Sequence, residues 1–203
     1  MKKIIQFISI LINTSLVAQP TLTAYGVNPV IGESFNYANS SYVSPGSSGS
    51  SQTWDLSTMV NVQSSTTNII NPSATSYASS FPNSNVCLQS GTTPTYFKTS
   101  STSFQNCGAV SSGVVLSYSN LEDLLHFPFT INNSFTDAFS STFISNGITF
   151  YRTGIVTVTA DGWGTLITPA GTFSNVLRVN IYEDYQDSAY FSGFPYILYY
   201  TND

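Results

Sequence analysis

The stretch from Ile155 to Tyr182 constrains the fold of this chain more than any other. Apolar and polar side chains alternate along it with a period of two, and the apolar positions include Val156, Val158, Ala160, Leu177, Val179 and Ile181. Successive side chains of a β-strand point to opposite faces, so this period indicates strands with one packed face. Between the two runs, Pro169 and Gly171 suit a tight turn. The sequence therefore predicts a β-hairpin from about Trp163 to about Tyr182, preceded by a strand that bends at Asp161–Gly162.

Composition extends this expectation to the whole chain. Charged residues make up 7% of the 203 residues and aromatic residues 14%, while Ser, Thr and Asn supply most of the polar character. Such a mixture suits strands joined by turns, whereas a helical domain would need more Ala, Glu, Lys and Leu. Short apolar runs separated by Gly, Pro and Ser between Asn85 and Tyr118 repeat the same rhythm. We expect one all-β domain, an antiparallel β-sandwich of jelly-roll type.

Several segments outside the hairpin carry weaker predictions. The Gly-, Ser- and Pro-rich stretch from Asn39 to Ser51 predicts a surface loop, and Gln52–Leu56 predicts a strand around Trp54. Leu121–Phe127 has apolar residues at helical spacing, but Pro128 follows at once, so we expect a turn or an edge strand there. The aromatic segment Tyr190–Tyr200 predicts one last strand.

Residues 1–18 have the pattern of a signal peptide. Lys2 and Lys3 precede a largely apolar run, Ile4–Val17, and Ala18–Gln19 is a plausible cleavage point. The run is too short to span a bilayer comfortably, so we expect no transmembrane segment in the mature chain. The β-sandwich domain then covers residues 19–203, and the protein is secreted or held at the cell surface.

Removal of the signal peptide makes the chain more acidic. Loss of Lys2 and Lys3 leaves 3 of the 5 basic residues against 10 acidic ones, which moves the formal charge from −5 to −7. An acidic chain without a basic stripe repels phosphate backbones, so nucleic acid is excluded as an expected partner. The same charge disfavours anionic membranes.

Both cysteines, Cys87 and Cys107, lie in the exported part of the chain. In an oxidising compartment they predict a disulfide, whose closure of a loop of about 20 residues would stabilise the fold by on the order of 3 kcal/mol. Two Cys and one His without a short C-x-x-C spacing do not form a structural zinc site. We expect no metal and no cofactor.

Four blocks of the sequence resemble a known class of exported proteins. The spelling ADGWGTLITPAGTFSNVLRVN from Ala160 to Asn180 is similar to a motif of N-terminal β regions of proteins exported by the type IX secretion system. Further matches occur, in the same order, at 45–57, 77–87 and 122–140. The resemblance implies a surface or secreted module of unassigned chemistry, usually followed by a strand and a C-terminal sorting domain. This chain ends at Asp203, before such a domain, so the resemblance leaves open a truncation at the C-terminus.

Aromatic side chains form the first candidate binding site. Trp54 and Trp163, with Tyr182 and Tyr185 nearby in the sequence, could provide flat faces on which the apolar face of a pyranose stacks. The alternative is that these rings belong to the core, where most aromatic residues of a sandwich lie.

Carboxylates form the second candidate site. Glu122, Asp123, Glu183 and Asp184 could supply the acid pair of a glycoside hydrolase, although solvated acidic turns are the simpler interpretation. A calcium site is disfavoured because the D-x-D-x-D-G motif of a calcium-binding loop is absent. His126 is the single histidine, and no G-x-S-x-G turn accompanies it, so we expect a strand histidine that only hydrogen-bonds.

Asp187-Ser188-Ala189 fits the short pattern seen for O-glycosylation in bacteria that use this export route. The resemblance therefore implies an exposed Ser188 loop that carries a sugar.

Three functional hypotheses follow. The first is a non-catalytic module of a secreted or cell-surface protein, with a spacer, adhesion or carrier role. The second is a carbohydrate-binding module whose partner is a cell-surface polysaccharide or other extracellular glycan. The third, less favoured, is a glycoside hydrolase.

Overall fold

The computed structural model describes residues 19–191 and 194–202, so the expected signal peptide at 1–18 lies outside the described residues. The described chain is built almost entirely of strands, which confirms the all-β prediction. Its elements are β1 Thr21–Leu22, α1 Ala24–Val27, β2 Ser34–Ser40, β3 Gly49–Asp55, β4 Asn61–Ile70, η1 Pro72–Ala74, η2 Ala78–Ser80, β5 Val86–Ser90, β6 Thr93–Thr99, β7 Ser103–Ser111, β8 Val114–His126, β9 Phe129–Thr130, β10 Ser134–Ser145, β11 Ile148–Thr168, β12 Gly171–Phe191 and β13 Phe194–Asn202.

One large sheet of 11 strands dominates the described part of the chain. Its order is β13-β12-β11-β10-β8-β7-β6-β5-β4-β2, with β3 paired to β11, while β1 and β9 form a separate pair. Every pairing in the large sheet is antiparallel except that of β3 with β11. Sheet neighbours are mostly chain neighbours, so the sandwich is connected as a meander, without the Greek-key crossovers of a jelly roll.

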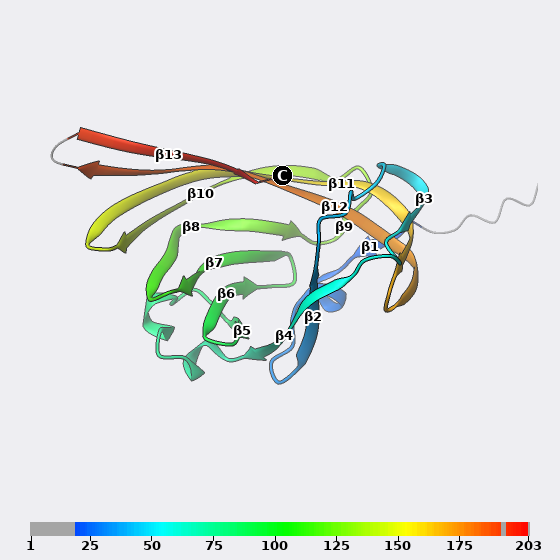
Figure 1. The fold of residues 1–203 in the computed structure, drawn as a ribbon, viewed down its shortest axis with the longest axis horizontal. Coiled ribbons are helices and arrows are strands. Elements are labelled where there is room, and N and C mark those ends of the chain that lie inside the picture. Colours follow the sequence, from blue (N-terminus) through cyan, green and yellow to red (C-terminus); the bar gives the residue numbers. More distant parts are fainter. Residues whose placement is uncertain (1–18, 192–193, 203) are drawn as a thin grey trace, which may run out of the picture.

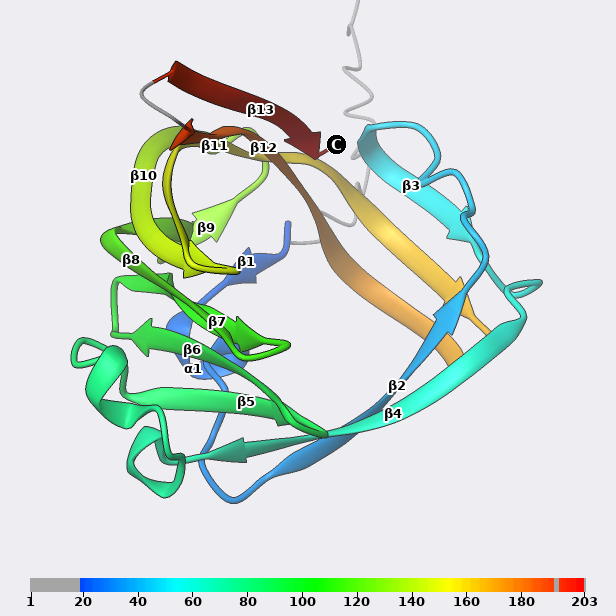
Figure 2. The same cartoon turned by 60° about the vertical axis from the view of Figure 1, so that its left-hand side comes forward.

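The sheet curls on itself, and this curl creates the two layers of the sandwich (Figures 1 and 2). β2 and β4 lie at one end of the strand order, and the curl brings them round to face the β11–β12 side of the molecule. The short β1 lies on the inner side, where Leu22 packs on the main core. We call the inner side the concave face and the other side the convex face.

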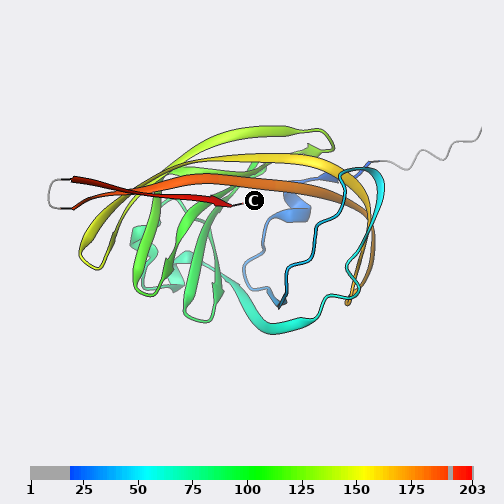
Figure 3. The same cartoon turned by 45° about the horizontal axis from the view of Figure 1, so that its top comes forward.

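The central hairpin is confirmed, and it is longer than expected. β11 and β12 pair from Phe150↔Ala189 to Thr168↔Gly171, and they run side by side along the molecule (Figure 3). The predicted bend is a register shift between Ala160 and Gly162, which leaves Asp161 as the extra residue of a β-bulge.

Alternation along β11 builds the main core. Val156, Val158 and Ala160 are completely buried, and they pack with Phe139 of β10 and Tyr118 of β8. Every second side chain of β11 therefore enters the concave face, as the period of two predicted.

Of the two alternatives predicted for Leu121–Phe127, the strand is the one observed. β8 continues through His126 and pairs there with β7, whereas its register with β10 is at Tyr118 and Asn120. Register shifts interrupt both ladders. These bulges break the period of two, and the apolar residues consequently fall at a spacing that imitates a helix.

The predicted disulfide is also wrong. Cys87 and Cys107 are both free and buried in a second core beneath η1 and η2. Cys87 on β5 lies opposite Tyr96 on β6, and Cys107 lies in a bulge of β7 on the other side of β6. Two strand spacings of about 4.8 Å separate the cysteines, whereas a disulfide needs Cα atoms within about 7 Å.

Across the residues that the structure describes, no helix is both long enough and apolar enough to cross a membrane.

Candidate functional site

The most unusual side chain on the concave face is Glu122. Asn106 of β7 lies opposite Phe97 of β6, and Glu122 of β8 lies opposite Asn106, so the three side chains share one face. Glu122 is only 1% exposed. The Asn106 amide donates a hydrogen bond of 2.9 Å to Oε2 of Glu122, while Oε1 has no hydrogen-bond partner among the described residues.

Glu183 meets Glu122 from across the curl. It lies opposite Val156 in the β11–β12 ladder, so its side chain also faces the concave side. β8 and β12 are not sheet neighbours, because β10 and β11 lie between them. Burial raises the pKa of Glu122 to about 7, with a further contribution from the negative charge of Glu183. Near neutral pH Glu122 is therefore partly protonated.

An arginine clamp lies on the same face beside this acid pair. Arg152 of β11 donates two hydrogen bonds, of 2.7 and 2.8 Å, to the carboxylate of Asp187 on β12. Its guanidinium also lies 4.0 Å from the ring centroid of Tyr185. Burial alone would lower the pKa of Arg152, but the hydrogen bonds and charge of Asp187 raise it overall. Burial also raises the pKa of Tyr118, the next ring in this network, to about 12.

The four predicted carboxylates do not form one catalytic pair. Glu122 lies near enough to Glu183 for the charge of Glu183 to raise its pKa, but Glu122 is only 1% exposed. Asp123 instead accepts a hydrogen bond of 2.7 Å at Oδ2 from Nε2 of the exposed His126, as expected for a strand histidine. Asp184 is exposed, and it alternates away from Glu183 to the convex face.

The predicted aromatic platform is dispersed over both faces. Trp54 is only 7% exposed, and its Nε1 donates to the backbone oxygen of Ser47 at 3.0 Å. Trp163 is half-buried, and its Nε1 has no hydrogen-bond partner in the described chain. Tyr182 and Tyr185 are three positions apart on one strand and so point to opposite faces. The four rings therefore cannot stack on one sugar.

The expected exposed loop at Ser188 is not present. Ser188 lies inside β12, opposite Tyr151 of β11 and Ile197 of β13, and its hydroxyl donates to the backbone oxygen of Tyr151 at 3.3 Å. Its neighbour Asp187 is buried in the arginine clamp. A strand paired on both sides does not present Ser188 as a loop would.

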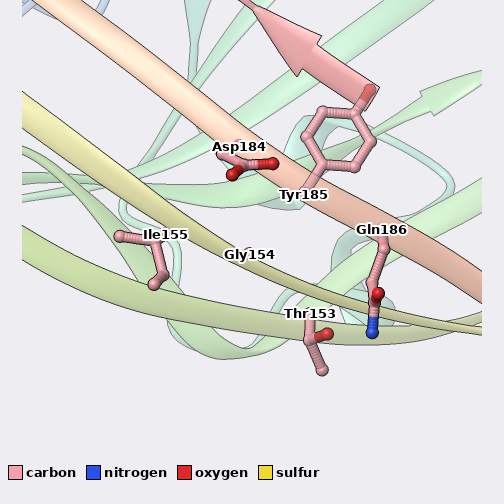
Figure 4. Close-up of a pocket in the computed structure, with 6 residues that line it drawn as sticks. All are labelled: Thr153, Gly154, Ile155, Asp184, Tyr185 and Gln186. Atoms are coloured by element: carbon pink, nitrogen blue, oxygen red, sulfur yellow. The ribbon is translucent and has the colours of Figure 1, made fainter. Parts of the chain in front are cut away.

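A shallow hollow of about 370 Å³ opens over β11 and β12 (Figure 4). Thr153 and Ile155 come from β11, and Asp184, Tyr185 and Gln186 come from β12. It includes two of the predicted site residues. The Tyr185 ring is already engaged by Arg152, so this hollow offers little aromatic surface to a ligand.

A larger hollow lies on the concave face at the other end of the sheet, and we call it the concave groove. Its volume is about 440 Å³, and its lining residues are Phe35, Tyr37, Thr67, Leu88, Ser90, Thr93, Thr95 and Phe97. Sequence reasoning missed it. The signal was the pair of aromatic residues two positions apart in the polar strand β2, since that spacing places both rings on one face.

Within the described ranges, no group of three or more His, Cys, Asp or Glu side chains is placed to hold a metal ion. No family model, curated protein or solved structure matches the chain.

Proposed function

We propose that this chain is a non-catalytic β-sandwich module of a secreted or cell-surface protein, with an adhesion, spacer or carrier role like that of type IX secretion cargo. The burial of Glu122 carries the proposal. Glu122 is 1% exposed, so it cannot reach a glycosidic bond in solution. The carboxylates most suited to hydrolysis are thus used inside the fold.

A carbohydrate-binding role is the second candidate, and the concave groove favours it. Phe35 and Tyr37 are 44% and 39% exposed there, and the remaining lining residues are apolar or carry hydroxyl groups. Exposed rings and hydroxyl groups together match the two faces of a sugar ring. Adhesion to an extracellular glycan would unite the two candidates.

Expression of the full chain in a bacterium with a type IX secretion system tests the export and the lack of catalysis together. We expect protein outside the cytoplasm whose mass corresponds to a start at Gln19, and no release of reducing sugar from cellulose, xylan, mannan or starch. Glu122→Gln serves as the matched variant. Hydrolysis by the wild type that disappears in Glu122→Gln would overturn the proposal, and retention in the cytoplasm with residues 1–18 attached would overturn the export.

A further inference from the structure

Tyr37 lines the concave groove. Tyr37 belongs to β2, yet its hydroxyl shares a hydrogen bond of 3.3 Å with Oγ of Ser90 on β5, and β4 lies between these strands. Two strand spacings amount to about 10 Å, so the side chain must extend along the sheet to make this bond. Hydrogen bonds to Ser90 and Ser65 also lower the pKa of Tyr37. The hydroxyl end of Tyr37 is therefore held at Ser90, inside the groove.

A strip of hydroxyl groups runs beside this ring. Thr67 of β4 lies opposite Phe35 on one side and Ser90 on the other, and Ser90 in turn lies opposite Thr93 of β6. Residues opposite one another on paired strands share a face, so Phe35 begins a row that continues as three hydroxyl side chains. The groove thus offers aromatic faces beside the accessible Ser90 and Thr93, about 5 Å apart, while Thr67 at the start of the row is only 5% exposed.

The lining of the groove indicates the charge of its ligand. None of its lining residues is ionised near neutral pH, and the chain as a whole carries a formal charge of −5. An anionic polysaccharide would be repelled by the chain and would find no cation in the groove. A purely apolar ligand would leave the exposed Thr93 hydroxyl at the rim of the groove without a partner. A neutral sugar satisfies both halves of the lining.

We propose that the concave groove binds a neutral polysaccharide, whose pyranose rings stack on Tyr37 and Phe35 and hydrogen-bond to the hydroxyl strip. This assignment rests on the carbohydrate-binding role among the proposed functions and adds the site and the ligand class to it. The groove volume of about 440 Å³ lies within the range of roughly 300–1,000 Å³ for small-ligand sites. Because the groove is open at the β2 edge, the glycan chain can extend beyond the sugars that contact the rings.

Affinity electrophoresis of the mature chain tests the site. The gels contain cellulose derivatives, xylan, mannan or starch as neutral glycans, and alginate as an anionic one. We expect retardation by at least one neutral glycan and none by alginate. Tyr37→Ala should weaken the binding about tenfold or more, as loss of an aromatic contact at the centre of a site does. Tyr37→Phe keeps the ring but removes the hydroxyl group that hydrogen-bonds to Ser90, so a smaller loss of affinity is expected.

Tyr182→Ala is the matched control. Tyr182 is 36% exposed, close to the 39% of Tyr37, but it lies on the convex face. Its substitution should leave the affinity within about twofold, and circular dichroism should show that both variants fold. Binding that persists in Tyr37→Ala, or that is lost in Tyr182→Ala, would show that the concave groove is not the binding site. The protein would still be a glycan-binding module. If no neutral glycan retards the protein, or if alginate does so instead, the ligand is not a neutral polysaccharide. The proposal of a non-catalytic module would remain. If the groove binds a fluorescent fatty acid and no glycan, it is a lipid site, and the proposal of a neutral polysaccharide ligand is wrong.

Discussion

At the scale of single residues, Glu122 connects burial, charge and stability. Its carboxyl group accepts a hydrogen bond from Asn106 and faces Glu183 in a setting that water does not reach. Ionisation of Glu122 would place a second negative charge near Glu183 in a medium of low polarity, so Glu122 keeps its proton to a higher pH than an exposed glutamate does.

The stability of the protein should consequently fall as the pH rises. The ordinary pKa of Glu122 is 4.5, and the folded state raises it to about 7. Between these values the folded state holds a proton that the unfolded chain has lost, so the free energy of unfolding decreases as the pH rises through this window. Glu122→Gln mimics the protonated acid. It should be close to the wild type at pH 5 and more stable at pH 8 by on the order of 2 kcal/mol, since one pKa unit corresponds to about 1.4 kcal/mol.

Urea denaturation at pH 5 and pH 8 measures this difference. Asp184→Asn is the control, because Asp184 is exposed on the convex face, and its effect should stay within about 0.5 kcal/mol at both pH values. If Glu122→Gln lowers the stability equally at both pH values, the folded state does not raise the pKa of Glu122.

At the scale of elements, the parallel pairing of β3 with β11 depends on the glycines of β11. β10 pairs with β11 only as far as Thr159, and β3 takes over the free edge from Gly162 onward. A Cβ atom at Gly164 would overlap the backbone of Gln52 in β3. Gly164 is therefore a glycine inside a strand at a point where another backbone approaches closely.

Gly164→Ala should detach β3 and expose Trp54. We expect a loss of more than about 2 kcal/mol in the free energy of unfolding and a shift of tryptophan emission to longer wavelength. Gly26→Ala is the control, because a Cβ there makes an ordinary contact of 3.8 Å with the Thr23 hydroxyl. Unchanged emission in Gly164→Ala would show that β3 tolerates the methyl group and is not held by close backbone contact.

Local patterns predicted some of these elements and misled on others. The β11–β12 hairpin was predictable because its alternation survives over most of both strands and its turn carries Pro169 and Gly171. β8 was not, since its bulges interrupt the alternation. The same periodicity could have separated Tyr182 from Tyr185, because an odd spacing places two strand residues on opposite faces.

At the scale of the whole molecule, the curl of the sheet determines which residues meet. Glu122 and Glu183 lie on strands that two others separate, and only the curl brings them into contact. Conversely, Cys87 and Cys107 are close in sequence, but β6 separates them. Such relations depend on strand order and curvature, which no local pattern in the sequence specifies. The groove, too, exists only because β2, β4, β5 and β6 are assembled side by side.

An NMR titration of the ¹⁵N-labelled mature chain with neutral hexasaccharides of β-glucan, xylan and mannan tests the central claim most directly, namely that the concave groove is the binding surface of a non-catalytic module. We predict that the amide signals of Phe35, Tyr37, Thr67 and Ser90 shift with the bound fraction, that those of Tyr182 and Asp184 do not, and that the sugar remains intact. Shifts confined to the convex face, or cleavage of the hexasaccharide, would contradict it.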